Sequence, residues 1–115
     1  MIVEDDPDTR AALAAFLETE GYAVAEAEHG LDALKQLRTL RDVGLIVLDL
    51  FMPTLNGLGF REEQMKDAGL SSIPVVVVSA DGNVPQKAAA IGARDYLLKP
   101  IDLDTLLATV QRYCC

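Results

Sequence analysis

Short apolar runs alternate with longer amphipathic or alanine-rich segments along the whole chain, and this alternation most limits the folds open to it. The apolar runs are brief and rich in β-branched residues, as at 2–3, 45–48 and 75–78. Such runs are typical of strands that are buried on both faces of a sheet. Strict alternation of strand and helix predicts a parallel sheet with helices on both sides. We therefore predict an α/β fold with a single core.

The elements follow from the apolar runs and from the turn and capping residues between them. We expect strands at 2–3, 22–28, 45–49, 75–79 and 96–98, and helices from 7 to the glycine at 21, from 31 to near 44, after 57, over 85–91 and after 102. For five strands this predicts a flavodoxin-like, doubly wound (βα)5 domain with a parallel sheet of order 2-1-3-4-5. The third helix has the weakest pattern, because Gly59 lowers its propensity and mainly Leu58, Met65 and Ala68 are left for packing.

That strand order brings several polar residues to one edge of the sheet. The strands at 2–3 and 45–49 become neighbours where the order reverses, and ligands of open α/β sheets bind at this point, outside the carboxyl ends. These ends carry Glu4 and Asp5, then Asp49, Ser79 and Lys99. Three carboxyl groups, a hydroxyl and an amine are thus expected to converge.

The converging groups indicate a particular chemistry. Several carboxylates packed together raise one another's pKa unless a cation lies between them. Oxygen ligands without histidine or thiol favour a hard ion, Mg²⁺ or alternatively Mn²⁺. Lys99 and Ser79 offer donors to phosphoryl oxygens. Asp49, on the central strand, is the natural nucleophile for phosphoryl transfer onto a carboxylate.

The composition excludes some classes of function. The chain has 10 basic and 18 acidic residues, a formal net charge of −8, whereas a nucleic-acid interface would show as a basic face. No apolar run approaches the ~18–20 residues of a membrane span, and the start does not read as a signal peptide. Cys114 and Cys115 are adjacent at the end and cross-link nothing. A cytoplasmic protein that contacts neither nucleic acid nor membrane is expected.

Four sequence pieces, in this order and spacing, resemble one known family along essentially the whole chain. They are IVEDDPDTR, DLFMPTLNG, VVVVSA and IGARDYLLKP. The chain resembles the receiver domain of bacterial two-component response regulators. The resemblance implies a receiver domain over residues 1–115 with no output domain in this chain. It implies a phosphoacceptor signalling domain rather than an enzyme, which assists only its own phosphorylation and dephosphorylation.

The resemblance also implies a role for each matching position. Arg10 sets the register, since the family's acidic pair precedes it by five and six residues. Asp5 is then the direct Mg²⁺ ligand, and Glu4 acts through water. Asp49 is similar to the phosphoacceptor, which also binds the metal, and the backbone carbonyl of Phe51 to the third protein ligand.

The remaining matches concern the conformational change that follows phosphorylation in this family. Ser79 is similar to the hydroxyl that moves to the phosphoryl group, and Tyr96 to the aromatic side chain that then turns inward. Lys99 is similar to the phosphate-binding lysine, and its bond to Pro100 is expected to be cis. The resemblance implies a sensor histidine kinase or histidine phosphotransfer protein as donor. The face formed by the helix at 85–91, the strand at 96–98 and the last helix is expected to change, and it could also form a homodimer.

Other interpretations remain open. Each site residue taken alone has a plain structural explanation: Asp49 could only end a strand, and Asp5 and Asp6 could only begin a helix. A pseudo-receiver, which acts as a phosphorylation-independent interaction domain, is the main alternative. A flavodoxin-like cofactor protein shares the fold, but it needs a Ser/Thr/Gly phosphate loop where this chain has acids.

Overall fold

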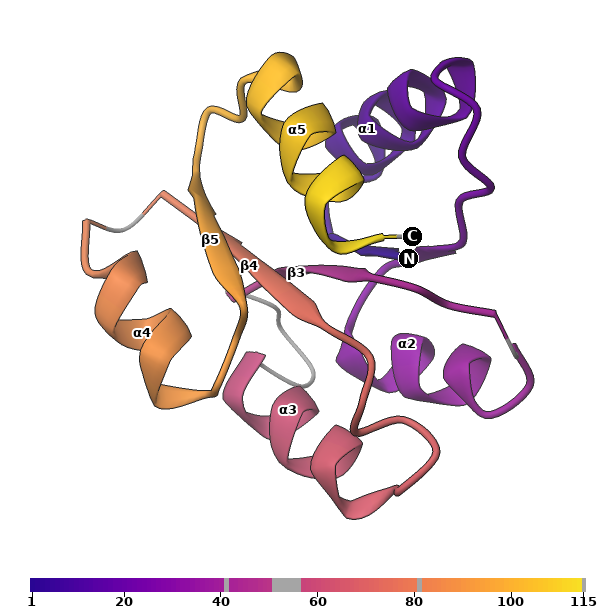
Figure 1. Cartoon of the computed structure of the whole chain (residues 1–115), viewed down its shortest axis with the longest axis vertical. Helices are drawn as coiled ribbons and strands as arrows, with labels where there is room; N and C mark the ends of the chain where they lie inside the picture. The colour runs from indigo at the N-terminus through magenta and orange to yellow at the C-terminus, as the bar shows by residue number, and fades with distance from the viewer. Residues whose placement is uncertain (41, 51–56, 81, 115) are drawn as a thin grey trace.

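The computed structural model describes residues 1–40, 42–50, 57–80 and 82–114. Strands and helices alternate along the chain (Figure 1): β1 (Ile2–Val3), α1 (Pro7–Thr19), β2 (Glu26–Ala27), α2 (Gly30–Leu37), β3 (Ile46–Asp49), α3 (Gly57–Lys66), β4 (Val75–Ser79), α4 (Val84–Ala90), β5 (Asp95–Leu98) and α5 (Leu103–Tyr113). Among the described residues, no helix is both long and apolar enough to cross a bilayer.

The five strands form one parallel sheet in the order β2-β1-β3-β4-β5. The predicted fold and strand order are confirmed. The register places Val3 beside Leu48, Asp49 beside Val78 and Ser79 beside Leu98. Because all strands run the same way, their carboxyl ends lie at one edge.

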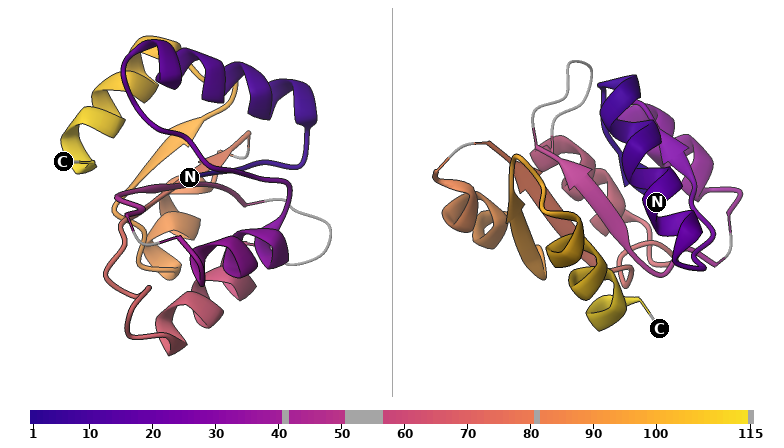
Figure 2. Two further views of the ribbon diagram at one scale, coloured as in Figure 1. Left: turned by 90° about the vertical axis from the view of Figure 1, so that its right-hand side faces the viewer. Right: turned by 90° about the horizontal axis from the view of Figure 1, so that it is seen from above.

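Helices cover both faces of the sheet, with α1 and α5 on one side and α2, α3 and α4 on the other (Figures 1 and 2). Each face has its own apolar cluster, and the strands contribute alternate residues to the two. Val47, Val76 and Val78 belong to the cluster under α1 and α5, whereas Leu48 and Val77 belong to the other. β3 and β4 are therefore buried on both faces, as their continuous apolar runs predict.

Two elements are shorter than expected. The strand predicted over 22–28 is limited to Glu26–Ala27, because β2 is an edge strand and its only partner, β1, has two strand residues. The second helix ends at Leu37 instead of near Gly44. Helix α1 ends as predicted, with Gly21 at a φ of 96°, in the left-handed region that favours glycine.

Helix α3 packs through residues that the sequence pattern did not indicate. Met65 and Ala68 were expected to pack, but Met65 is 53% exposed and Ala68 is exposed beyond the helix end. Phe60 and Gln64 are instead completely buried. The Gln64 amide donates from Nε2 to the carbonyl oxygens of Leu70 (2.9 Å) and Ile73 (3.0 Å). A polar side chain thus satisfies the backbone of the loop that leads into β4.

We predict that Gln64→Leu lowers the free energy of unfolding by about 1–3 kcal/mol, because the part-buried Ile73 carbonyl loses the Gln64 donor and the Leu70 carbonyl keeps only the Ile73 amide. Urea unfolding followed by circular dichroism measures the change. The matched control is Glu62→Leu, an exposed position on the same helix, which should change stability by about 0.5 kcal/mol or less. Equal losses in the two variants would contradict this role for the Gln64 amide.

Candidate functional site

The carboxyl edge of the sheet brings together four of the residues expected at the site. Asp49 ends β3, while Glu4, Asp5 and Lys99 directly follow the ends of β1 and β5. Glu4 and Asp49 are each only 4% exposed, whereas Asp5 is exposed. Carboxylate oxygens of Glu4, Asp5 and Asp49 lie within 4.8 Å of one another. Two buried acids and one exposed acid thus share one small volume.

The Lys99 ammonium group holds the two buried acids together. Its Nζ lies 3.1 Å from Oδ2 of Asp49 and 3.2 and 3.4 Å from the two carboxylate oxygens of Glu4. An unpaired buried carboxylate is very costly, and a charged hydrogen-bonding partner offsets much of that cost. Lys99 is therefore part of the acidic cluster as well as a neighbour of any group that binds to it.

The pKa values reflect this crowding. Burial, followed by the hydrogen bond and negative charge of Asp49, raises the pKa of Glu4 from 4.5 to about 7, against the opposite effect of Lys99. Burial acts to lower the pKa of Lys99, but its hydrogen bonds and ion pairs with Asp49 and Glu4 outweigh burial and raise it. Lys99 therefore stays protonated near neutral pH, and Glu4 readily takes up a proton.

The donor set suits a hard divalent cation. Three carboxylates offer oxygen ligands alone, with no histidine or thiol among them, which favours Mg²⁺ or Mn²⁺ over zinc. Asp5 is the accessible member. A cleft of about 650 Å³ opens beside the cluster, and it is lined by Glu4, Asp5, Asp6, Thr9, Ala12, Leu13, Lys99, Pro100, Ile101 and Leu103. A ligand can thus reach Glu4 and Asp5 from solvent.

The other predicted positions are placed as follows. Ser79 ends β4, is 1% exposed, and its carbonyl oxygen accepts a hydrogen bond from the Lys99 amide. Tyr96 lies on the edge strand β5 and is 40% exposed. The Lys99–Pro100 bond is cis, as the resemblance implies. Phe51, predicted to supply a carbonyl ligand, lies outside the described residues.

Arg10 contacts the site in a way that the sequence did not indicate. In the sequence, Arg10 only identifies which two acids form the pair. In the structure, its Nη1 donates to the carbonyl oxygen of Glu4 at 2.8 Å. A long side chain one turn into a helix can reach back to the strand end before it. That geometry could have suggested the contact.

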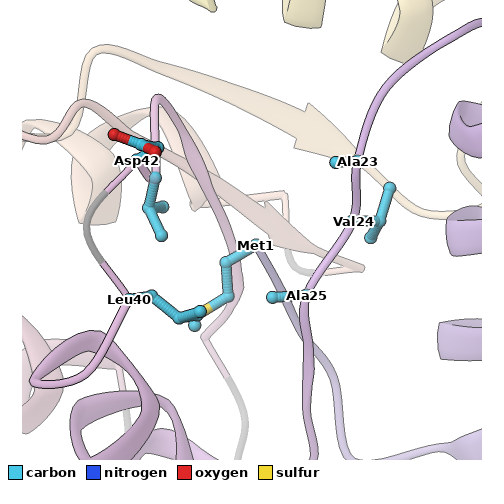
Figure 3. A pocket seen from close by; sticks show the side chains of 7 residues that line it. Met1, Ala23, Val24, Ala25, Leu40 and Asp42 are labelled. Carbon is cyan, nitrogen blue, oxygen red and sulfur yellow. The ribbon is translucent and has the colours of Figure 1, made fainter.

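A second hollow lies at the opposite, amino edge of the sheet and differs in chemistry. It has a volume of about 320 Å³ and is lined by Met1, Ala23, Val24, Ala25, Leu40, Asp42 and Val43, which precede the first three strands or follow α2. Figure 3 shows its labelled side chains, which are apolar apart from Asp42. Among the described residues that line it, Asp42 is the one carboxylate, fewer than the several oxygen ligands that a divalent cation takes. The polar chemistry of this hollow is slight compared with that of the carboxyl edge.

Comparisons with known proteins agree with this fold. The family model for the response regulator receiver domain matches residues 1–111. Protein PilH of Pseudomonas aeruginosa is 38% identical over 113 residues, which cover 96% of this chain and 93% of PilH. The transcriptional regulatory protein GlrR of Escherichia coli is 34% identical, but the chain spans only 25% of GlrR. The chain belongs to the response regulator receiver domain family.

Solved structures show the same likeness. The chemotaxis protein CheY4 of Vibrio cholerae superposes with a TM-score of 0.89 at 28% identity, covering 97% of this chain and 94% of CheY4. The receiver domain of sensor histidine kinase PA1611 from Pseudomonas aeruginosa gives a TM-score of 0.87 at 26% identity, with 97% and 93% coverage, and holds a magnesium ion in its active site cleft. Receiver domains bind Mg²⁺ in an acidic pocket, and the cluster of Glu4, Asp5 and Asp49 fits such a pocket.

The raised pKa of Glu4 predicts a pH dependence of stability in metal-free buffer. The folded protein holds the Glu4 proton up to about pH 7, whereas the unfolded chain releases it near pH 4.5. This proton therefore stabilises the fold below pH 4.5, and its contribution is lost as pH rises from about 4.5 to about 7.

The measurement compares urea unfolding of the wild type and Glu4→Gln in EDTA across this range. The free energy of unfolding of the wild type, relative to that of Glu4→Gln, should fall as pH rises. Parallel pH profiles for the two proteins would show that Glu4 titrates normally.

Proposed function

We propose that this chain is a phosphorylation-controlled receiver domain whose phosphoacceptor is Asp49. The observation that carries the proposal is the buried Asp49 carboxylate, in contact with the Lys99 ammonium group and next to two further acids. The donor is a phosphohistidine on a sensor histidine kinase or a histidine phosphotransfer protein, the general kind of partner that receiver domains have. The chain works in the cytoplasm, and residues 1–115 form a single receiver domain.

The transfer is a displacement at phosphorus. A carboxylate oxygen of Asp49 forms a new O–P bond while the P–N bond to the donor imidazole breaks, and the bonding electron pair stays on the imidazole nitrogen. Lys99 neutralises charge on the phosphoryl oxygens, and the Ser79 hydroxyl donates a hydrogen bond to them. The product is an aspartyl phosphate. Burial of Asp49 at a strand end fixes the direction from which its oxygen can attack.

A bound Mg²⁺ ion would neutralise the acids and the phosphoryl oxygens. Asp5 and Asp49 would hold it directly, Glu4 through water, and the Phe51 backbone carbonyl would complete the protein ligands. The exposure of Asp5 to the cleft supports its part, since the ligand must be reachable from solvent. Mn²⁺ has the same preference for oxygen ligands.

Phosphorylation would then shift the chain between two conformations that both exist beforehand. Ser79 moves towards the phosphoryl group, and Tyr96, now 40% exposed, turns inward. The face formed by α4, β5 and α5 changes as a result. That face is the proposed docking surface for a downstream partner or for a second copy of this chain.

The pseudo-receiver alternative keeps one observation in its favour. Lys99 already pairs with both Glu4 and Asp49, so the two buried acids have a counter-charge without metal or phosphate. Such a cluster could serve only to stabilise an interaction domain. The labelling experiment below separates the two functions.

We predict that acetyl phosphate phosphorylates the wild type in Mg²⁺, as read from intact mass. Labelling should be lost on addition of EDTA and reduced at least about 100-fold in Asp49→Asn, because a carboxamide oxygen is a poor nucleophile. The matched control is Asp67→Asn, an exposed acid in the loop after α3, which should be labelled like the wild type. Equal labelling of Asp49→Asn and wild type would overturn the assignment, and absence of labelling in all three would favour the pseudo-receiver.

A further inference from the structure

Arg10 connects three elements at the amino end of α1. Its Nη1 donates to the Glu4 carbonyl oxygen at 2.8 Å, and its Nε lies 3.5 Å from Oε1 of Glu26 on β2. The Arg10 side chain is only 18% exposed. It is thus a largely buried cation with two fixed partners, and one of these is the backbone of the acidic segment.

The Glu4 carbonyl is a position where the sheet no longer holds the chain. β1 ends at Val3, and the Glu4 amide still donates to the Ala27 carbonyl at 3.0 Å, just beyond the end of β2. The Glu4 carbonyl oxygen accepts instead from Arg10. Both sides of the Glu4 backbone are therefore held, one by β2 and the other by Arg10.

This hydrogen bond acts on the two acids at once. The Glu4 carbonyl belongs to the planar peptide unit that joins Glu4 to Asp5, so holding it fixes the N–Cα bond of Asp5, from which the Asp5 side chain branches. Asp5 is exposed, and a side chain without surrounding packing depends on its backbone for its position. Partners of metal ligands in the outer shell commonly change metal affinity by about 10–100-fold.

We propose that Arg10 is a positioning residue of the acidic site, which holds the Glu4–Asp5 peptide so that both carboxylates face Asp49. The inference rests on the proposed function, because it takes the cluster to be a divalent-cation site. It assigns Arg10 no contact with the cation or with the phosphoryl group.

Charge and position predict effects of opposite sign. If Arg10 acted only as a nearby cation, its removal would make the site more negative and strengthen Mg²⁺ binding. If Arg10 acts through the Glu4 carbonyl, its removal frees the acidic segment and weakens Mg²⁺ binding. The direction of the change therefore identifies the mechanism.

The experiment measures Mg²⁺ affinity by isothermal titration calorimetry on the wild type, Arg10→Met and Arg10→Lys. Arg10→Met keeps much of the side-chain length without a donor, and the dissociation constant should rise about tenfold. Arg10→Lys keeps one donor and the charge, and should stay within about threefold of the wild type. Lys66→Met is the matched control: it removes an exposed cation on α3, and its effect on Mg²⁺ affinity should be below about twofold.

A second readout separates positioning from a purely structural role. In saturating Mg²⁺, Arg10→Met should reach the labelling rate of the wild type with acetyl phosphate within about twofold, because only metal affinity depends on Arg10. Circular dichroism at the same temperature verifies folding. If Arg10→Met does not fold, Arg10→Ala, which also removes the donor to the Glu4 carbonyl, replaces it and should also bind Mg²⁺ more weakly than the wild type.

The possible failures are distinguishable. If the wild type binds Mg²⁺ and folded Arg10→Met binds it equally well or more tightly, the positioning role is overturned. The proposed function is then left intact. A labelling rate that stays low at saturating Mg²⁺ would also overturn the positioning role. Absence of Mg²⁺ binding by the wild type would remove both the proposed function and this inference.

Discussion

The contact of one ammonium group with two buried carboxylates is the interaction on which the carboxyl edge depends. Lys99 lies within 3.4 Å of Glu4 and 3.1 Å of Asp49, and without it two acids of about 4% exposure would lie side by side without the counter-charge that contacts both carboxylates. Such an arrangement is costly, because burial and like charge both oppose ionisation. The same three groups are those that a cation and a phosphoryl group would engage. The same charges therefore determine both the stability of this edge of the sheet and its proposed chemistry.

The sheet topology makes this contact possible between residues that are far apart in the sequence. Lys99 follows β5 at one edge of the sheet and Glu4 follows β1 near the other, yet the parallel order brings all carboxyl ends to the same side. β3 and β4 lie between them and are buried on both faces. The hydrogen bond from Arg10 to the Glu4 carbonyl holds the chain one residue beyond β1. Packed strands and fixed backbone contacts suit a site whose geometry must be set before its ligand arrives.

The strand order and the residues at the strand ends could be predicted because they depend on hydrophobic periodicity and on the rules for parallel sheets. Contacts that depend on the length and direction of a side chain could not be predicted in this way. The pairing of Lys99 with Glu4 depends on the lengths of two side chains and on the twist of the sheet. The hydrophobic pattern of the sequence carries no information on either. Gln64 was missed for another reason: an amide counts as polar in an amphipathic pattern, yet it is buried here because it satisfies two carbonyl groups. The short β2 follows from the length of its partner, a tertiary effect.

The proposed chemistry requires that the acidic edge binds a divalent cation and a phosphoryl group together, through Asp49. The most direct measurement is ¹⁹F NMR with beryllofluoride, which has the shape and charge of a phosphoryl group attached to a carboxylate. Bound fluoride resonances should appear in the presence of Mg²⁺ and disappear in EDTA and in Asp49→Asn. Bound resonances that persist in Asp49→Asn, or that never appear in the wild type with Mg²⁺, would contradict the proposed chemistry.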